Sequence, residues 1–172
     1  GDPTRRASVQ ILLEIARAGA DVLEVGVPFS DPLADGPVIQ RATERALAGG
    51  TTLRGALEIV REVRASVDTP IVLFTYANPV VRMDPAVFAR SAKEAGVDGV
   101  LILDYPIEEA EPLRQPRVEA GLDPVFLISP TTTDERIRRA GELGRGFLYL
   151  ISRMGVTGIR DDLAPDVSAL VE

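Results

Sequence analysis

The sequence contains no cysteine and no histidine. Without cysteine the chain can form no disulfide framework, no thiolate nucleophile and no zinc site with sulfur ligands. Without histidine it has no imidazole base and no imidazole metal ligand. Proton transfer must therefore be carried out by Asp, Glu, Lys or Tyr side chains, and the kind of metal site that stays open is one made of carboxylates, such as a magnesium site.

Positive charge and long apolar runs are also scarce. Lysine and arginine total 19 against 26 aspartates and glutamates, a net charge of -7, which argues against a protein that coats the phosphates of nucleic acid. No apolar run approaches the roughly 20 residues that span a bilayer. The first residues, GDPTRRASVQ, lack the apolar core of a signal peptide. We therefore expect a cytoplasmic protein that binds neither nucleic acid nor membrane.

What the sequence does contain is the composition of a globular protein. Its 172 residues are 45% apolar, with a mean hydropathy of +0.11, which suffices for one domain with a sizeable core. No linker, low-complexity run or close repeat divides the chain. We therefore expect a single domain over residues 1–172.

Short apolar runs rich in Val, Ile and Leu alternate with segments of helical spacing. Each run is too short for a typical helix and predicts a buried strand. The predicted strands are 21–27, 70–76, 98–104, 124–129 and 146–152. The predicted helices are 4–18, 38–48, 52–66, 84–95, 107–120, 133–142 and 162–172. Pro116 is expected to kink or split the helix over 107–120.

This alternation indicates an α/β fold with a parallel sheet whose faces are covered by helices. Two architectures fit: a closed (βα)8 TIM barrel and an open doubly wound sheet. Five strands are too few to close a barrel. The first residues, GDPT, look like the loop and helix cap that follow a strand, and the last, DVSALVE, lie inside a predicted helix. We therefore expect an incomplete TIM barrel with about five parallel strands and flanking helices, lacking one strand before these residues and two or more after them.

Glu24 stands inside the apolar run DVLEVGV, where a charged residue is unexpected. Side chains alternate along a strand, so Glu24 and Gly26 share one face while Leu23 and Val25 share the other, which suits packing on helices. In a barrel the face of Glu24 is the interior, near the strand end where active sites of this fold collect. Burial there would raise the pKa of Glu24 and suit it to proton transfer near neutral pH. The alternative is a structural carboxylate satisfied by a neighbouring donor.

Asp35 lies in the loop LADGP that follows the same strand. An Asp before Gly is commonly a turn former, and that alternative stays open. Paired with Glu24, Asp35 would supply a second carboxylate in a different environment, so that one is partly protonated while the other stays ionised. Asp31, which precedes Pro32, is expected to be structural or to lie at an interface.

Apolar and aromatic residues occupy the ends of the other predicted strands. Residues two apart on a strand face the same way and can line a pocket for a flat apolar ligand, with ordinary core packing as the alternative for each. These residues are Phe74, Tyr76, Leu101, Leu103, Leu127 and Tyr149. The segment SRMGVTG, residues 152–158, is a candidate mobile lid or anion-contacting loop.

Taken together, these segments resemble the α subunit of tryptophan synthase. The resemblance rests on LEVGVPFSDPLADGPVIQRA and, in the same order along the chain, on FTYANPV, ILDYPIEEAEPLR, LISPTTTDERI and GFLYLISRMGVTG. It implies a (βα)8 barrel that acts in tryptophan biosynthesis as a lyase. The reaction is a retro-aldol cleavage of indole-3-glycerol phosphate to indole and glyceraldehyde 3-phosphate, without a metal ion or an organic cofactor.

The resemblance also implies roles for single residues. Glu24 corresponds to the family's catalytic glutamate, which moves the proton at the indole ring carbon and the glycerol hydroxyl. Asp35 corresponds to the aspartate that binds the indole N–H and stabilises positive charge on the ring. The residues that match the indole pocket are Phe74, Tyr76, Leu101, Leu103, Leu127 and Tyr149. The residues that match the closing loop are Arg153, Gly155, Gly158 and Thr157, of which Thr157 would reach Asp35.

A partner follows from the same resemblance, namely the β subunit of an α2β2 heterotetramer. Asp31, Pro32 and Asn78 match the surface that meets it. The family's phosphate-binding loops follow barrel strands seven and eight, which we do not expect among these residues. Two alternatives stay open: a stand-alone indole-glycerol-phosphate lyase, and a catalytically incompetent fragment that retains only the surface for the β subunit.

Overall fold

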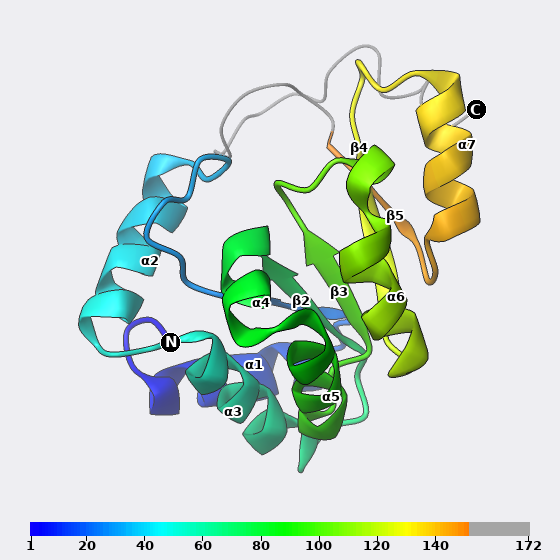
Figure 1. Ribbon diagram of the computed structural model, residues 1–172. Helices are drawn as coiled ribbons and strands as arrows, with labels where there is room; N and C mark the ends of the chain where they lie inside the picture. The colour runs from blue at the N-terminus through cyan, green and yellow to red at the C-terminus, as the bar shows by residue number, and fades with distance from the viewer. Residues whose placement is uncertain (152–172) are drawn as a thin grey trace.

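The structure is a computed structural model that describes residues 1–151 (Figure 1). The helix expected over 162–172 and the segment SRMGVTG lie outside the described residues. Five strands form one parallel sheet, as predicted. They are β1 (Leu23–Gly26), β2 (Ile71–Thr75), β3 (Gly99–Ile102), β4 (Asp123–Ile128) and β5 (Leu148–Leu150).

The order of the strands confirms the predicted TIM-barrel architecture over a doubly wound sheet. A doubly wound sheet reverses its strand order at a switch point, whereas a TIM barrel adds each strand beside the previous one. Here the order is β1-β2-β3-β4-β5, and every neighbouring pair is parallel. The described residues therefore form a five-stranded half-barrel.

The helices lie close to their predicted positions. They are α1 (Arg5–Arg17), α2 (Pro37–Ala48), α3 (Leu53–Arg64), α4 (Ala77–Met83), α5 (Pro85–Ala95), the short 3-10 helix η1 (Ile107–Glu109), α6 (Glu111–Glu119) and α7 (Asp134–Leu143). The hydroxyls of Thr52 and Thr133 and the carboxylate of Asp84 accept hydrogen bonds from backbone N–H groups in the first turns of α3, α7 and α5. No helix within residues 1–151 is long and apolar enough to cross a bilayer.

Two predictions about helices were wrong. The short helix α4 was not expected, because its sequence ANPVVRM offers a single turn-forming Asn-Pro pair and too few residues for a periodic pattern. The helix over 107–120 is interrupted at Ala110, and α6 continues through Pro116. Pro112 occupies the first turn of α6, where proline fits well, and Pro116, which lacks the N–H that would donate to the carbonyl of Pro112, is accommodated within the helix.

The strands separate two apolar layers. One set of side chains points to the helices, where α1 packs on α3, α3 on α5 and α5 on α6. This outer core contains the strand residues Leu23, Val25, Ile71, Leu73 and Val100. The opposite, inner face carries a smaller cluster built on Val72, Leu101 and Val125. The inner face is the one that a closed barrel would enclose.

A polar network ties α3 to the amino ends of β2 and β3. The Arg64 guanidinium donates hydrogen bonds of 3.0–3.1 Å to three backbone carbonyls, those of Val67, Thr69 and Gly96. It also pairs with Asp98 at 2.5 Å, and Asp98 in turn accepts a hydrogen bond of 2.8 Å from the backbone N–H of Ile71. This end of a TIM barrel serves stability.

Arg117 is a buried cation between α6 and β3. Its side chain is 3% exposed, and it donates to the carbonyls of Leu113 at 2.9 Å and Val100 at 3.1 Å. Burial lowers the pKa of Arg117 to about 10, and the nearby charge of Arg114 acts in the same direction. No carboxylate pairs with Arg117 among residues 1–151.

Candidate active site

Glu24 lies on the inner face of β1, as predicted from the alternation. The burial of β1 alternates, with Leu23 and Val25 buried and Glu24 and Gly26 exposed, and Glu24 is in register with Val72 of β2. The side chain of Glu24 stays accessible to solvent, yet the surrounding protein removes part of its hydration and raises its pKa. A hydrogen bond from the Tyr149 hydroxyl acts in the opposite direction.

The expected pocket residues of β2 to β5 share this inner face. Phe74 and Tyr149 form a tilted aromatic pair with ring centroids 5.8 Å apart. Register places Leu101 beside Phe74 and Leu127 beside Tyr149, and Leu103 packs against the inner cluster. Glu24 is therefore a carboxylate at the border of an apolar and aromatic surface, near the Tyr149 hydroxyl.

Asp35 lies in the loop between β1 and α2, and Tyr76 holds it there. The Tyr76 hydroxyl donates a hydrogen bond of 3.2 Å to Asp35 Oδ2 and accepts one of 3.0 Å from the backbone N–H of Ala34. Tyr76 is 3% exposed and stacks against Phe29, with ring centroids 5.2 Å apart. Burial raises the pKa of Asp35, and the hydrogen bond from Tyr76 opposes that rise.

Asp35 was also considered as a turn former, and its hydrogen bonds show that its backbone has this role while its carboxylate does not. Its backbone N–H closes a turn onto the carbonyl of Pro32 at 3.2 Å, and Gln40 Nε2 donates to its carbonyl at 2.8 Å. The N-terminal cap of α2 is Gly36, which has no side chain, and the Asp35 carboxylate is directed to Tyr76 instead. The backbone of Asp35 therefore shapes the loop, while its carboxylate is presented to the site.

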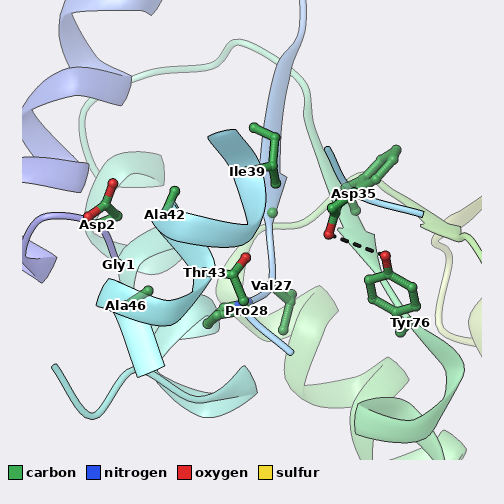
Figure 2. A pocket seen from close by; sticks show the side chains of 12 residues that line it. Gly1, Asp2, Val27, Pro28, Asp35, Ile39, Ala42, Thr43, Ala46 and Tyr76 are labelled. Atoms are coloured by element: carbon green, nitrogen blue, oxygen red, sulfur yellow. Dashed lines mark hydrogen bonds between the residues drawn. The ribbon is translucent and has the colours of Figure 1, made fainter. Parts of the chain in front are cut away.

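A pocket of about 150 Å³ opens beside Asp35 (Figure 2). Three of the predicted site residues line it, namely Asp35, Phe74 and Tyr76. The remaining lining residues are Gly1, Asp2, Gly26, Val27, Pro28, Ile39, Ala42, Thr43 and Ala46. The lining from Gly1, Asp2 and α2 was missed from the sequence, because no local pattern reports that the amino-terminal loop and α2 meet.

The structure does not gather all predicted site residues into that one pocket. Glu24, Leu101 and Tyr149 lie farther along the inner face, outside the residues that line it. Leu103 and Leu127 line a second pocket of about 200 Å³ together with Ser129, Thr132 and Arg136. The described residues thus present two carboxylates on one side of the half-barrel, each with a tyrosine hydroxyl, rather than one closed cavity.

The predicted interface residues lie on exposed segments near the site. Asp31 is exposed and accepts a hydrogen bond of 2.5 Å from the Ser30 hydroxyl. Pro32 follows it, and Asn78 lies in the first turn of α4. The predicted closing-loop residues Arg153, Gly155, Thr157 and Gly158 lie outside the described residues. No group of three or more acidic side chains suited to a metal ion occurs within residues 1–151.

Comparison with known proteins identifies what this arrangement is similar to. The family model described as tryptophan synthase alpha chain matches residues 1–172. Tryptophan synthase alpha chains from Paraburkholderia phymatum and Burkholderia thailandensis are each 53% identical over 159 residues, which is 92% of this chain and 59% of theirs. The chain thus spans about three fifths of the length of the curated relatives it matches.

Solved structures agree with the sequence relatives. The crystal structure of tryptophan synthase subunit alpha from Legionella pneumophila matches with a TM-score of 0.85 and 42% identity, covering 88% of this chain and 58% of that one. A structure of the tryptophan synthase a2b2 complex from Pyrococcus furiosus matches with a TM-score of 0.84 and 43% identity, covering 87% of this chain and 62% of that one. The half-barrel is therefore similar to part of a complete alpha subunit.

Proposed function

The chain belongs to the tryptophan synthase alpha chain family, and from that premise we propose that it carries the residues that cleave a carbon–carbon bond in indole-3-glycerol phosphate. The products are indole and glyceraldehyde 3-phosphate. The observation that carries the proposal is the place of Glu24 on the inner face of β1, in register with Val72 and near the aromatic pair of Phe74 and Tyr149, where partial burial raises its pKa. A carboxyl group with a raised pKa holds its proton more readily than an exposed one and can both give and take a proton.

Glu24 would act on two atoms of the substrate in turn. Its protonated form delivers a proton to the ring carbon that bears the glycerol chain, which turns the indole ring into a cation. The resulting carboxylate then removes the proton of the chain hydroxyl next to that carbon. The C–C bond breaks, its electron pair returns to the ring, and the hydroxyl becomes the aldehyde of glyceraldehyde 3-phosphate. Glu24 ends the cycle protonated, as it began.

Asp35 would stabilise the cation that exists between these two steps. An ionised carboxylate near the ring N–H offsets positive charge as it develops on the ring. Tyr76 supports this role because its hydrogen bond favours the ionised form of Asp35, against the rise in pKa that burial causes. Two carboxylates with different surroundings can thus divide proton transfer and charge stabilisation between them.

The apolar inner face would hold the flat indole ring. Phe74 and Tyr149 supply aromatic surface at a centroid distance of 5.8 Å, and the leucines beside them would shield the ring from water. Thr157 as a contact of Asp35, and Arg153, Gly155 and Gly158 as parts of a closing loop, belong to this proposal. The phosphate group would be held by residues other than those described.

A partner is part of the same proposal. We expect Asp31, Pro32 and Asn78 to face a β subunit in an α2β2 complex, because the solved relative from Pyrococcus furiosus is such a complex. That relative favours the partner-bound alternative over a stand-alone lyase. The proposal also includes a cytoplasmic location and a single partial-barrel domain over residues 1–172.

The test is the substitution Glu24→Gln, which keeps the size of the side chain and removes its titration. We expect kcat for indole release to fall by more than about 100-fold, the low end for loss of a general acid-base group, with substrate binding preserved. Glu94→Gln is the matched control, because Glu94 is exposed on α5, outside both described pockets. Turnover of the Glu24 variant within a few fold of the unaltered chain would refute the assignment.

A further inference from the structure

Helix α2 borders the site but buries few apolar side chains. Of its twelve residues only Ala46 is buried, whereas α3, of the same length, buries six. Val38, Ile39 and Leu47 of α2 are 63%, 43% and 36% exposed. Figure 1 shows α2 standing apart from the layer formed by α1, α3 and α5. Apolar packing within the described residues therefore does little to fix where α2 lies.

One polar contact joins α2 to a distant segment of the chain, and a second, local contact joins its first turns to the loop that carries Asp35. Near its carboxyl end, Arg45 donates from Nε and Nη2 to the two carboxylate oxygens of Asp2, both at 2.8 Å. Near its amino end, Gln40 Nε2 donates to the carbonyl of Asp35 at 2.8 Å. A two-pronged guanidinium–carboxylate pair fixes orientation as well as distance, because both groups are planar and both hydrogen bonds must align.

The loop that carries Asp2 is itself attached to the body of the protein. The Ser8 hydroxyl of α1 donates to the carbonyl of Asp2 at 3.2 Å and to that of Thr4 at 3.1 Å. Ser8 is one of the few buried polar residues. Asp2, in the segment that precedes α1, is therefore held to α1 by Ser8, and Arg45 connects α2 to Asp2.

The pocket lies between these two attachments. The side of α2 that faces it consists of Ile39, Ala42, Thr43 and Ala46, with Asp2 near one end of the pocket and Asp35 near the other (Figure 2). The small side chains of Ala42 and Ala46 leave open space at the wall of the pocket. A displacement of α2 would therefore change the width of the pocket and, through Gln40, the place of Asp35.

We propose that the Asp2–Arg45 pair is a positioning device, which fixes α2 as a wall of the pocket and thereby holds Asp35 in its working position. Neither residue touches the reacting atoms; both act through the helix. The expected effect on catalysis rests on the proposed function, since Asp35 matters for turnover only if it stabilises the cationic ring. The expected effect on α2 itself does not rest on it.

The Arg45 side chain is 57% exposed and that of Asp2 25% exposed, so removal of the pair should loosen α2 without unfolding the protein. Exposed ion pairs make modest contributions, which correspond to a change in an equilibrium of about two- to five-fold. We therefore expect Arg45→Met to raise the hydrogen-exchange rates of backbone amides 38–48 by about that factor, with exchange in α1 and α3 unchanged. Asp2→Asn should do the same from the other side.

Arg41→Met is the matched control, because Arg41 is on the same helix, carries the same charge and makes no ion pair within residues 1–151. Faster exchange in α2 for Arg45→Met and Asp2→Asn, but not for Arg41→Met, is the expected result. Equal exchange in α2 for all three variants and the unaltered chain would overturn the proposal. So would a general rise in exchange across α1 and α3, because the pair would then act on overall stability.

Steady-state kinetics connect the device to the site. For the full chain we expect Arg45→Met to lower kcat for indole release several-fold, and the exchanged pair Asp2→Arg with Arg45→Asp to recover part of that loss. If Asp2 and Arg45 acted only through packing, exchanging their charges would not recover kcat. If the unaltered chain releases no indole, the proposed function fails, while hydrogen exchange still decides whether the pair positions α2.

Discussion

Replacing Tyr76 by phenylalanine removes one hydroxyl and leaves the aromatic ring that packs against Phe29. That hydroxyl donates to Asp35 Oδ2 at 3.2 Å and accepts from Ala34 N–H at 3.0 Å. Burial raises the pKa of Tyr76 itself to about 12, so its proton stays in place throughout the usable pH range. The substitution therefore tests a single donated hydrogen bond to Asp35, together with the loss of one acceptor for the loop.

The size of the effect follows from the geometry. A hydrogen bond to a charged group contributes about 1.5 kcal/mol at the low end, and a contact of 3.2 Å between two oxygens is long, so about 1 kcal/mol is appropriate. One pKa unit corresponds to 1.36 kcal/mol. The bond stabilises the ionised form, so its loss should raise the pKa of Asp35 by roughly 0.5 to 1 unit, above a value that burial has already raised.

Two measurements check this shift. Carboxyl carbon NMR of the chain should show the titration of Asp35 moved to higher pH in Tyr76→Phe. If ionised Asp35 is needed for turnover, the acid limb of kcat/KM should move in the same direction by the same amount. Tyr105→Phe is the control, because no hydrogen bond of the Tyr105 hydroxyl is found within residues 1–151. An unchanged or lowered pKa of Asp35 would refute the reasoning.

The same shift has a consequence for stability. A carboxyl whose pKa is higher in the folded than in the unfolded state contributes stability below its unfolded pKa, and that contribution is lost as pH rises through the folded pKa. Asp35 is of this type, since its pKa is raised. Loss of the Tyr76 hydrogen bond should therefore destabilise the fold by about 1 kcal/mol more at pH 7 than at pH 3.

Two further predictions concern the fold. Arg64→Ala should lower the free energy of unfolding, measured in urea, by about 3 kcal/mol, because three carbonyls lose a charged donor. Arg64→Lys should recover part of this loss. A loss below about 1 kcal/mol for Arg64→Ala would contradict the role of the network. Arg117→Met should leave the free energy of unfolding unchanged or raise it by about 1 kcal/mol. The reason is that a buried charge without a carboxylate partner is replaced by an apolar side chain of similar length. A loss above about 2 kcal/mol would show that the two hydrogen bonds to carbonyls outweigh the cost of desolvating the guanidinium.

The apolar runs were enough to predict all five strands and the face of Glu24. A buried parallel strand can be predicted from a short run of Val, Ile and Leu. The alternation of side chains then assigns each residue to a face without knowledge of distant residues. The consecutive strand order was not local information. It depends on which strands pair. The apolar runs alone fit a doubly wound sheet equally well, and the barrel was predicted from the segments GDPT and DVSALVE and from the family resemblance.

The supports of the site could not be predicted in the same way. The hydrogen bond from Tyr76 to Asp35 joins residues 41 positions apart, and that from Arg45 to Asp2 joins residues 43 positions apart. Neither has a periodic signal, since each depends on how a loop is placed on a neighbouring element. Tyr76 was expected to line a pocket and does so. Its hydrogen bond to Asp35 could not be predicted, because it depends on the pairing of β1 with β2.

The strand order has a further consequence for how the chain becomes folded. Each strand pairs with its predecessor in the sequence, so every newly made strand meets a sheet edge that already exists. Residues emerging from a ribosome could therefore be added one β-α unit at a time, without waiting for a distant partner. Tyr76 lies directly after β2, so the hydrogen bond to Asp35 needs only the first two strands, whereas the approach of Tyr149 to Glu24 needs β5 as well.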